Sequence, residues 1–101
     1  MLKFWLLFTS IALASCAAEI GDSCGSDVEC GAGLVCDQYS NDGYCTIEDC
    51  EYSGCPDGAR CVVFEDMNAF CMAACSSSGD CRDGYSCIAD ESTGAYCGQN
   101  E

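Results

Sequence analysis

Apolar residues crowd the start of the chain and become sparse beyond it. A run from Phe4 to Ala14 follows the basic Lys3 and is itself followed by small residues. This order is typical of a secretory signal peptide, and the run is too short for a membrane span, which needs about 20 apolar residues. The chain beyond it would be only marginally stable through apolar burial alone. Its scattered aliphatic residues are Ile20, Val28, Leu34, Val35, Ile47, Val62, Val63 and Ile88.

Strand-forming residues flank a short polar tip at three places, which predicts three β-hairpins. The first tip ends in Asp42-Gly43, a pair that is favoured in tight hairpin turns. The hairpins, with their tips in parentheses, are expected at 34–45 (40–43), 60–72 (65–68) and 85–97 (90–94).

The cysteines divide the chain into three copies of one unit. Twelve of the thirteen cysteines repeat the spacing C, four or five residues, C, five residues, C, eight or nine residues, C. The units span 24–45, 50–71 and 75–97. Their cysteines are Cys24, Cys30, Cys36 and Cys45; Cys50, Cys55, Cys61 and Cys71; and Cys75, Cys81, Cys87 and Cys97.

Two further positions repeat with the cysteines. A glycine stands three residues before each third cysteine and an aromatic residue directly before each fourth; these are Gly33, Gly58 and Gly84, and Tyr44, Phe70 and Tyr96. The glycines predict turns with positive φ, and the rings predict packing against the bridges. We expect a small disulfide-rich fold of three tandem units, each with a short β-hairpin and little helix. Because the linkers 46–49 and 72–74 are short, we expect an elongated stack with contacts only between neighbours.

So many cysteines predict six disulfides and an oxidising compartment, which excludes the cytoplasm. Each bridge would stabilise the chain by about 2–4 kcal/mol. Within each unit we favour pairing of the first cysteine with the third and the second with the fourth, although sequence alone does not choose the connectivity. Zinc is disfavoured because the chain has no histidine and no C-x2-C pair.

The end of the apolar run offers a candidate lipid anchor. Leu13-Ala14-Ser15-Cys16 resembles the bacterial lipobox, in which the cysteine is lipidated and becomes the mature N-terminus. The alternative is an ordinary signal cut after Ala18, which also leaves twelve cysteines. The first interpretation gives a signal peptide at 1–15, a lipidated N-terminus and short tether at 16–23, a cysteine-rich region at 24–97 and a tail at 98–101. Ala17 in the second mature position would favour an outer membrane.

The charge of the chain limits the classes of partner that it is expected to bind, since the chain has 17 acidic residues against three basic ones. Without a basic patch, nucleic-acid binding is not expected, and anionic lipid would not attract the surface. Solubility is the simpler explanation of the acidity. Weak, non-specific calcium association is conceivable at two clusters, but neither has an EF-hand spacing. These are Asp37 with Asn41 and Asp42, and Glu48 with Asp49 and Glu51.

Catalysis finds no support in the sequence, so we expect a protein that is not an enzyme and has no cofactor or dedicated metal site. The chain contains no histidine, no G-x-S-x-G elbow and no phosphate-binding glycine loop. A pair of carboxylates would need a pocket that raises one pKa. So few apolar residues can hardly enclose such a pocket.

Two resemblances rest on cysteine spacing and flanking residues. The first unit, at 24–30 (CGSDVEC), 33–36 (GLVC) and 43–45 (GYC), resembles the opening of the Dickkopf N-terminal cysteine-rich domain, and 80–81 (DC) with 84–87 (GYSC) is similar. Dickkopf proteins are secreted animal signalling antagonists, but the lipobox and the absence of a Cys-Cys pair depart from them. More broadly, the chain resembles cysteine-rich repeat lipoproteins of predatory and social bacteria.

These observations leave two classes of function. We favour a lipid-anchored surface protein of the cell envelope whose rigid acidic scaffold serves adhesion, envelope structure or recognition of an unknown protein partner. The alternative is a freely secreted, extracellular effector or inhibitor that binds a receptor or protease through a hairpin tip. Exposed aromatic residues are the first contact candidates, although they would equally serve to shield disulfides. They are Tyr39, Tyr52, Phe64 and Tyr85.

Overall fold

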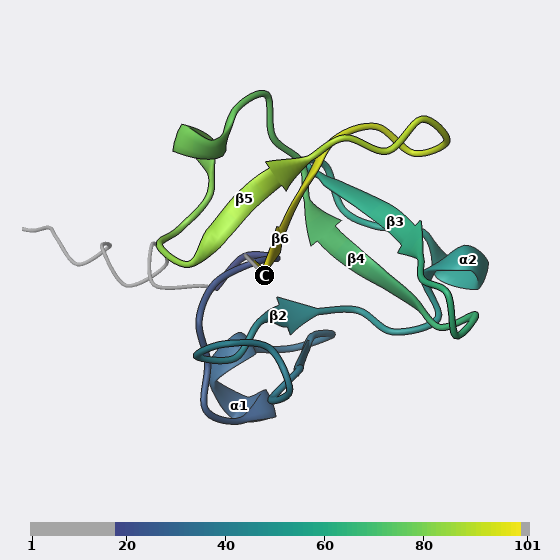
Figure 1. Ribbon diagram of the computed structural model, residues 1–101. Helices are drawn as coiled ribbons and strands as arrows, with labels where there is room; N and C mark the ends of the chain where they lie inside the picture. Colours follow the sequence, from purple (N-terminus) through teal and green to yellow (C-terminus); the bar gives the residue numbers. More distant parts are fainter. Residues whose placement is uncertain (1–17, 100–101) are drawn as a thin grey trace, which may run out of the picture.

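A computed structural model describes residues 18–99 of the chain. The predicted signal peptide, the predicted lipobox and Cys16 lie outside these residues, as does the end of the predicted tail. Each unit consists of one helical turn followed by a two-stranded antiparallel hairpin (Figure 1). The helical turns are α1 (Asp27–Cys30), α2 (Cys50–Ser53) and the 3-10 turn η2 (Ser78–Asp80). The strands are β1 (Val35–Cys36), β2 (Cys45–Thr46), β3 (Ala59–Val63), β4 (Ala69–Ala73), β5 (Tyr85–Ile88) and β6 (Tyr96–Gln99). The predicted fold class is therefore confirmed, with each hairpin where the sequence placed it.

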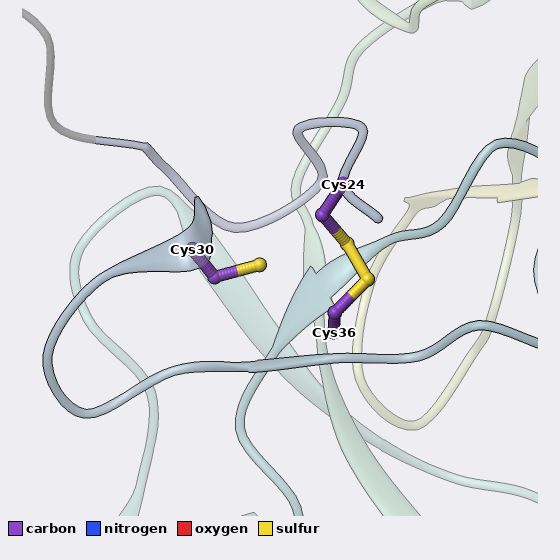
Figure 2. Close-up of side chains that lie close together, drawn as sticks. All are labelled: Cys24, Cys30 and Cys36. Carbon is purple, nitrogen blue, oxygen red and sulfur yellow. A yellow bond between two sulfur atoms is a disulfide. The ribbon is translucent and has the colours of Figure 1, made fainter. Parts of the chain in front are cut away.

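Disulfides tie each helical turn to its hairpin. All six bridges join the first cysteine of a unit to the third or the second to the fourth, so the favoured pairing is confirmed. The third and fourth cysteines are cross-strand partners, as in Cys61 and Cys71, yet each bonds back to the segment before the hairpin. In every unit three sulfur atoms lie within 4.8 Å of one another. Figure 2 shows the Cys24–Cys36 bridge with the sulfur of Cys30 beside it.

The repeated glycines have the backbone conformation that the sequence predicts. Gly33, Gly58 and Gly84 have φ of 84°, 87° and 88°, a region that costs other residues energy. Gly43 has a second constraint beyond its φ of 74°, because a Cβ there would collide with the main-chain carbonyl of Cys24. The Asp42-Gly43 turn is thus fixed both by its conformation and by the first bridge.

The expected elongated stack is wrong, because the first and third units are in direct contact. The hydroxyl of Tyr44 donates to the carbonyl of Cys97 at 3.0 Å, and the amide of Asn41 donates to the side chain of Gln99 at 2.7 Å. The three hairpins are arranged in a triangle rather than a line (Figure 1). Arrays limited to neighbour contacts leave their ends free, whereas here the buried hydroxyl of Tyr44 and the exposed amide of Asn41 in the first unit both bond to the end of the third hairpin.

The core is small and rich in sulfur. Cys50, Ala69 and Cys71 are buried together, and Ile20 and Ile47 pack against them. The N-terminal segment joins this body, since the amide of Gly21 donates to the carbonyl of Cys45 at 2.9 Å. Among residues 18–99 no helix has the length and apolar character needed to cross a bilayer.

Candidate functional site: a groove between the three hairpins

A groove of about 730 Å³ lies where the three units meet, and we call it the three-hairpin groove. Its lining comes from every unit. The residues are Asp37, Ser40, Tyr44, Thr46, Phe64, Glu65, Asp66, Phe70, Met72, Tyr85, Ile88, Tyr96, Gly98 and Gln99. Since no single unit forms this surface, the groove exists only because the units assemble into a triangle.

Aromatic rings form the apolar part of the groove. The ring of Phe64 lies 6.0 Å from that of Phe70 and 6.2 Å from that of Tyr96, the latter edge-on at 90°. These three side chains, together with Met72, are half-buried. Such tilted and edge-to-face pairs are the favoured geometries between aromatic rings. The groove therefore keeps a partly exposed, well-ordered apolar surface.

The hydroxyl of Tyr96 belongs to the groove as well. Burial raises the pKa of this phenol above its usual value, and the negative charge of Asp90 raises it further. The groove therefore presents a hydroxyl group in addition to the aromatic rings.

Carboxylates lie along the groove, and local hydrogen bonds hold two of them in place. Asp37 accepts hydrogen bonds from the amide of Tyr39 at 3.1 Å and the hydroxyl of Ser40 at 3.0 Å. Asp66, in the tip between β3 and β4, accepts two from Asn68, at 3.1 and 3.0 Å. Its neighbour Glu65 is exposed. The groove thus combines aromatic rings with carboxylates from the first and second units.

Arg82 joins the first and third units and contacts Tyr85, one of the groove residues. Its guanidinium donates to the carbonyls of Gly21 at 2.7 Å and Asn41 at 2.6 Å, and also to that of Gly43. It lies 4.4 Å from the ring centroid of Tyr85, in the arrangement of a cation–π contact. Arg82 is consequently a structural clamp between non-adjacent units.

Tyr44 completes this junction. Its ring lies 5.4 Å from that of Tyr85, and its hydroxyl donates to Cys97 and accepts from the amide of Ala73 at 2.9 Å. Burial raises the pKa of Tyr44, and Tyr85 adds to this, whereas the hydrogen bond from Ala73 opposes it. One phenol therefore connects all three units.

Arg60, the other arginine of residues 18–99, also joins two units. Arg60 on β3 donates to the carbonyls of Ala95 at 2.7 Å and Thr93 at 3.3 Å in the hairpin of the third unit. Both arginines of residues 18–99 thus bind main-chain carbonyls between units. Of the carboxylates that line the groove, Glu65 and Asp66 are exposed and Asp37 is half-buried.

The four predicted contact residues differ in their exposure and in whether they line the groove. Tyr39 and Tyr52 are 99% and 87% exposed, but neither lines the groove. Phe64 is half-buried and lines it. The expectation that Tyr85 is exposed is wrong, because it is only 5% exposed. Its hydroxyl donates to the carbonyl of Asn41 at 2.9 Å, which holds it at the junction with the first unit.

Sequence reasoning missed Phe70, Met72, Ile88 and Tyr96 as groove residues. A signal was present for two of them, since Phe70 and Tyr96 occupy the repeated aromatic position before the fourth cysteine. That position was interpreted only as packing against the unit's own bridge. In the structure both rings contact Phe64. The cross-unit contact has no local signature, because it depends on how the hairpins are placed.

The sulfur atoms that lie close together in each unit are not available as metal ligands. Each of the twelve cysteines of the described region is in a disulfide, so none offers a thiolate. In the first acidic cluster the carboxylate of Asp37 accepts hydrogen bonds from its own loop, and the carbonyl of Asn41 accepts one from Arg82. Calcium association stays a prediction.

No protein-family profile, curated protein or solved structure matches this chain.

Proposed function

We propose that this protein is a lipid-anchored, non-enzymatic recognition protein of the cell envelope that binds a protein partner in the three-hairpin groove. The observation that carries the proposal is that residues of all three units line one groove with ordered aromatic rings. Aromatic side chains are the most frequent energetic anchors of protein interfaces. Six bridges hold these rings in place before binding, which lowers the entropic cost of association.

The disulfides support an exported protein. Six bridges persist in a periplasm, at a cell surface or outside the cell, and not in a reducing cytoplasm. The lipid anchor is the finer part of the proposal and rests on the lipobox at 13–16. Because Ile20 already packs against the core, a lipid on Cys16 would be separated from it by at most about 14 Å of extended chain. Such an anchor would hold the body close to the bilayer.

A recognition role fits the groove better than catalysis does. The groove is open, and the carboxylates of Asp37 and Asp66 accept hydrogen bonds from their own loops. Acid–base chemistry would need a carboxyl group whose pKa is raised by burial. The groove instead offers aromatic rings, a phenol and carboxylates that accept hydrogen bonds from their own loops, a combination suited to binding.

The anchor is tested by the intact mass of the unreduced mature protein from its own host. We expect a chain that begins at Cys16, heavier by acyl and diacylglyceryl groups and lighter by twelve hydrogens. A Cys16→Ser variant should leave the membrane fraction with its bridges intact. A lipid-free wild-type chain that begins near Glu19 would refute the anchor and favour the freely secreted effector. A Cys16→Ser variant that stays membrane-bound would refute it as well.

A further inference from the structure

We propose that the three-hairpin groove binds an arginine or lysine side chain within a basic segment of the partner protein. The inference rests on the proposed recognition function and specifies the chemistry of the partner. Its starting point is the coincidence of two features, partly exposed aromatic rings and carboxylates beside them. An apolar ligand would use only the first feature, whereas a cationic side chain uses both.

The aromatic rings provide the first contact. A cation is attracted to the face of an aromatic ring within about 6 Å of its centroid. The edge-on contact between Phe64 and Tyr96 fixes the relative orientation of the two rings. The methylene groups of an arginine or lysine would also cover apolar surface at Met72 and Ile88, since both line the groove. The fold already uses this chemistry internally, where Arg82 lies over Tyr85.

The carboxylates provide the second contact. Glu65 and Asp66 come from the β3–β4 tip, and Asp37 comes from the first unit. Both arginines of residues 18–99 bind main-chain carbonyls instead. A cation from outside would therefore meet carboxylates that line the same groove as the rings. The net charge of −14 for the whole chain would also speed the approach of a basic partner.

The β3–β4 tip is shaped unusually for its sequence. Met67 has a φ of 70° and is 77% exposed, although this region is uncommon for residues other than glycine. Its amide donates to the carbonyl of Phe64 at 2.9 Å, and the amide of Phe64 donates to Asn68 at 2.9 Å. Backbone strain of this kind clusters at binding sites. Here it accompanies a tip that brings Phe64, Glu65 and Asp66 to the groove.

The test uses the oxidised mature protein and two synthetic peptides. The first is an unstructured peptide with two arginines, and the second replaces both with citrulline, a neutral isostere. Binding is followed by NMR titration at about 150 mM salt, where long-range attraction is largely screened. We expect the arginine peptide to shift the ring signals of Phe64, Phe70 and Tyr96. The citrulline peptide should bind at least about tenfold more weakly, because it lacks the charge that both contacts require.

Matched variants separate the groove from the general acidity of the surface. Glu65→Gln should weaken binding about threefold to fivefold, as expected for one partly screened charge contact. Glu51→Gln removes the same charge from exposed α2, outside the groove, and should change affinity less than about twofold. Phe64→Leu keeps apolar volume but removes the ring, and should weaken binding by about threefold or more. Circular dichroism and the unreduced mass check that each variant is folded.

Several results would overturn the inference: equal binding of the two peptides, equal effects of Glu65→Gln and Glu51→Gln, or ring signals that stay unmoved. If Phe64→Leu fails to fold, the pair of exposed glutamate variants still decides. A lipid-free mature chain would refute the anchor and leave this result unaffected. Conversely, a lipid-anchored chain that binds neither peptide would refute the proposed cationic ligand and leave the lipid-anchor proposal unaffected.

Discussion

At the scale of single residues, one repeated position has acquired different roles. Tyr44, Phe70 and Tyr96 each precede a fourth cysteine and all three line the groove, yet Tyr44 is buried at the junction of the three units while the other two are half-buried and contact Phe64. The difference follows from what each ring meets after assembly. The hydroxyl of Tyr44 finds both a donor and an acceptor in other units, and a buried phenol needs such partners.

We predict that Tyr44→Phe destabilises the protein by about 2 kcal/mol at neutral pH, because the carbonyl of Cys97 and the amide of Ala73 both lose a hydrogen bond. The raised pKa of Tyr44 adds a pH dependence. Above about pH 10 the unfolded phenol ionises while the folded one stays protonated, so wild-type stability falls as pH rises. The variant lacks this contribution, so the difference between the two proteins should narrow there.

Denaturant unfolding with the bridges intact, followed by near-ultraviolet circular dichroism at pH 7, 9 and 10.5, measures this difference. A gap between wild type and Tyr44→Phe that stays constant up to pH 10.5 would contradict the prediction.

At the scale of elements, the unit is a helical turn bonded twice to a short hairpin. Strands as short as β1 and β2 are marginal in isolation, and the bridges supply the constraint that so few apolar residues cannot. The six bridges differ in burial. In the bridge Cys30–Cys45 both cysteines are buried. In the bridges Cys24–Cys36 and Cys75–Cys87 all four cysteines are half-buried.

We predict that limited reduction opens Cys24–Cys36 and Cys75–Cys87 before Cys30–Cys45, because a reductant must reach the sulfur that it attacks. Brief exposure to a water-soluble phosphine at acidic pH, followed by alkylation and peptide mapping, gives the order. Bridge exchange is slow under these conditions, since thiolates are scarce. Early alkylation of Cys45 would show that exposure does not govern the order.

At the scale of the whole molecule, two arginines hold the triangle of units together. Arg82 binds carbonyls around the first hairpin from the third unit, and Arg60 binds carbonyls of the third hairpin from the second. The planar guanidinium directs several donors at once, which a lysine ammonium cannot reproduce in the same geometry. The assembly therefore depends on the shape of these side chains as well as on their charge.

We predict that Arg82→Lys costs about 2 kcal/mol of stability, the value of a charge-assisted hydrogen bond, and loosens the contact between the first and third units. Hydrogen exchange should accelerate at the amide of Asn41, which donates to Gln99. Arg60→Lys is the matched control, because it keeps the charge and affects the contact between the second and third units. Equal protection of Asn41 in wild type and Arg82→Lys would refute the role of this clamp.

The sequence by itself determined the local structure of each unit, namely its hairpin and its turns. Cysteine spacing and turn residues are local signals, so the hairpins and the positive φ of Gly33, Gly58 and Gly84 were confirmed. The pairing of the first cysteine with the third and the second with the fourth was favoured by the sequence, but the structure decided it. Only the tertiary structure decided how the units are placed. Burial of Tyr85 and the contact of the first unit with the third depend on residues up to 58 positions apart, as between Asn41 and Gln99.

The groove, too, was decided only by the tertiary structure. Phe64, Phe70 and Tyr96 were visible as aromatic residues in the sequence, but their meeting in one groove follows from the closure of three hairpins into a triangle. Hydrogen bonds from Tyr44, Arg60 and Arg82 to main-chain carbonyls connect the units in this arrangement. Every residue offers a main-chain carbonyl, so no sequence pattern marks which carbonyl such a side chain will bind.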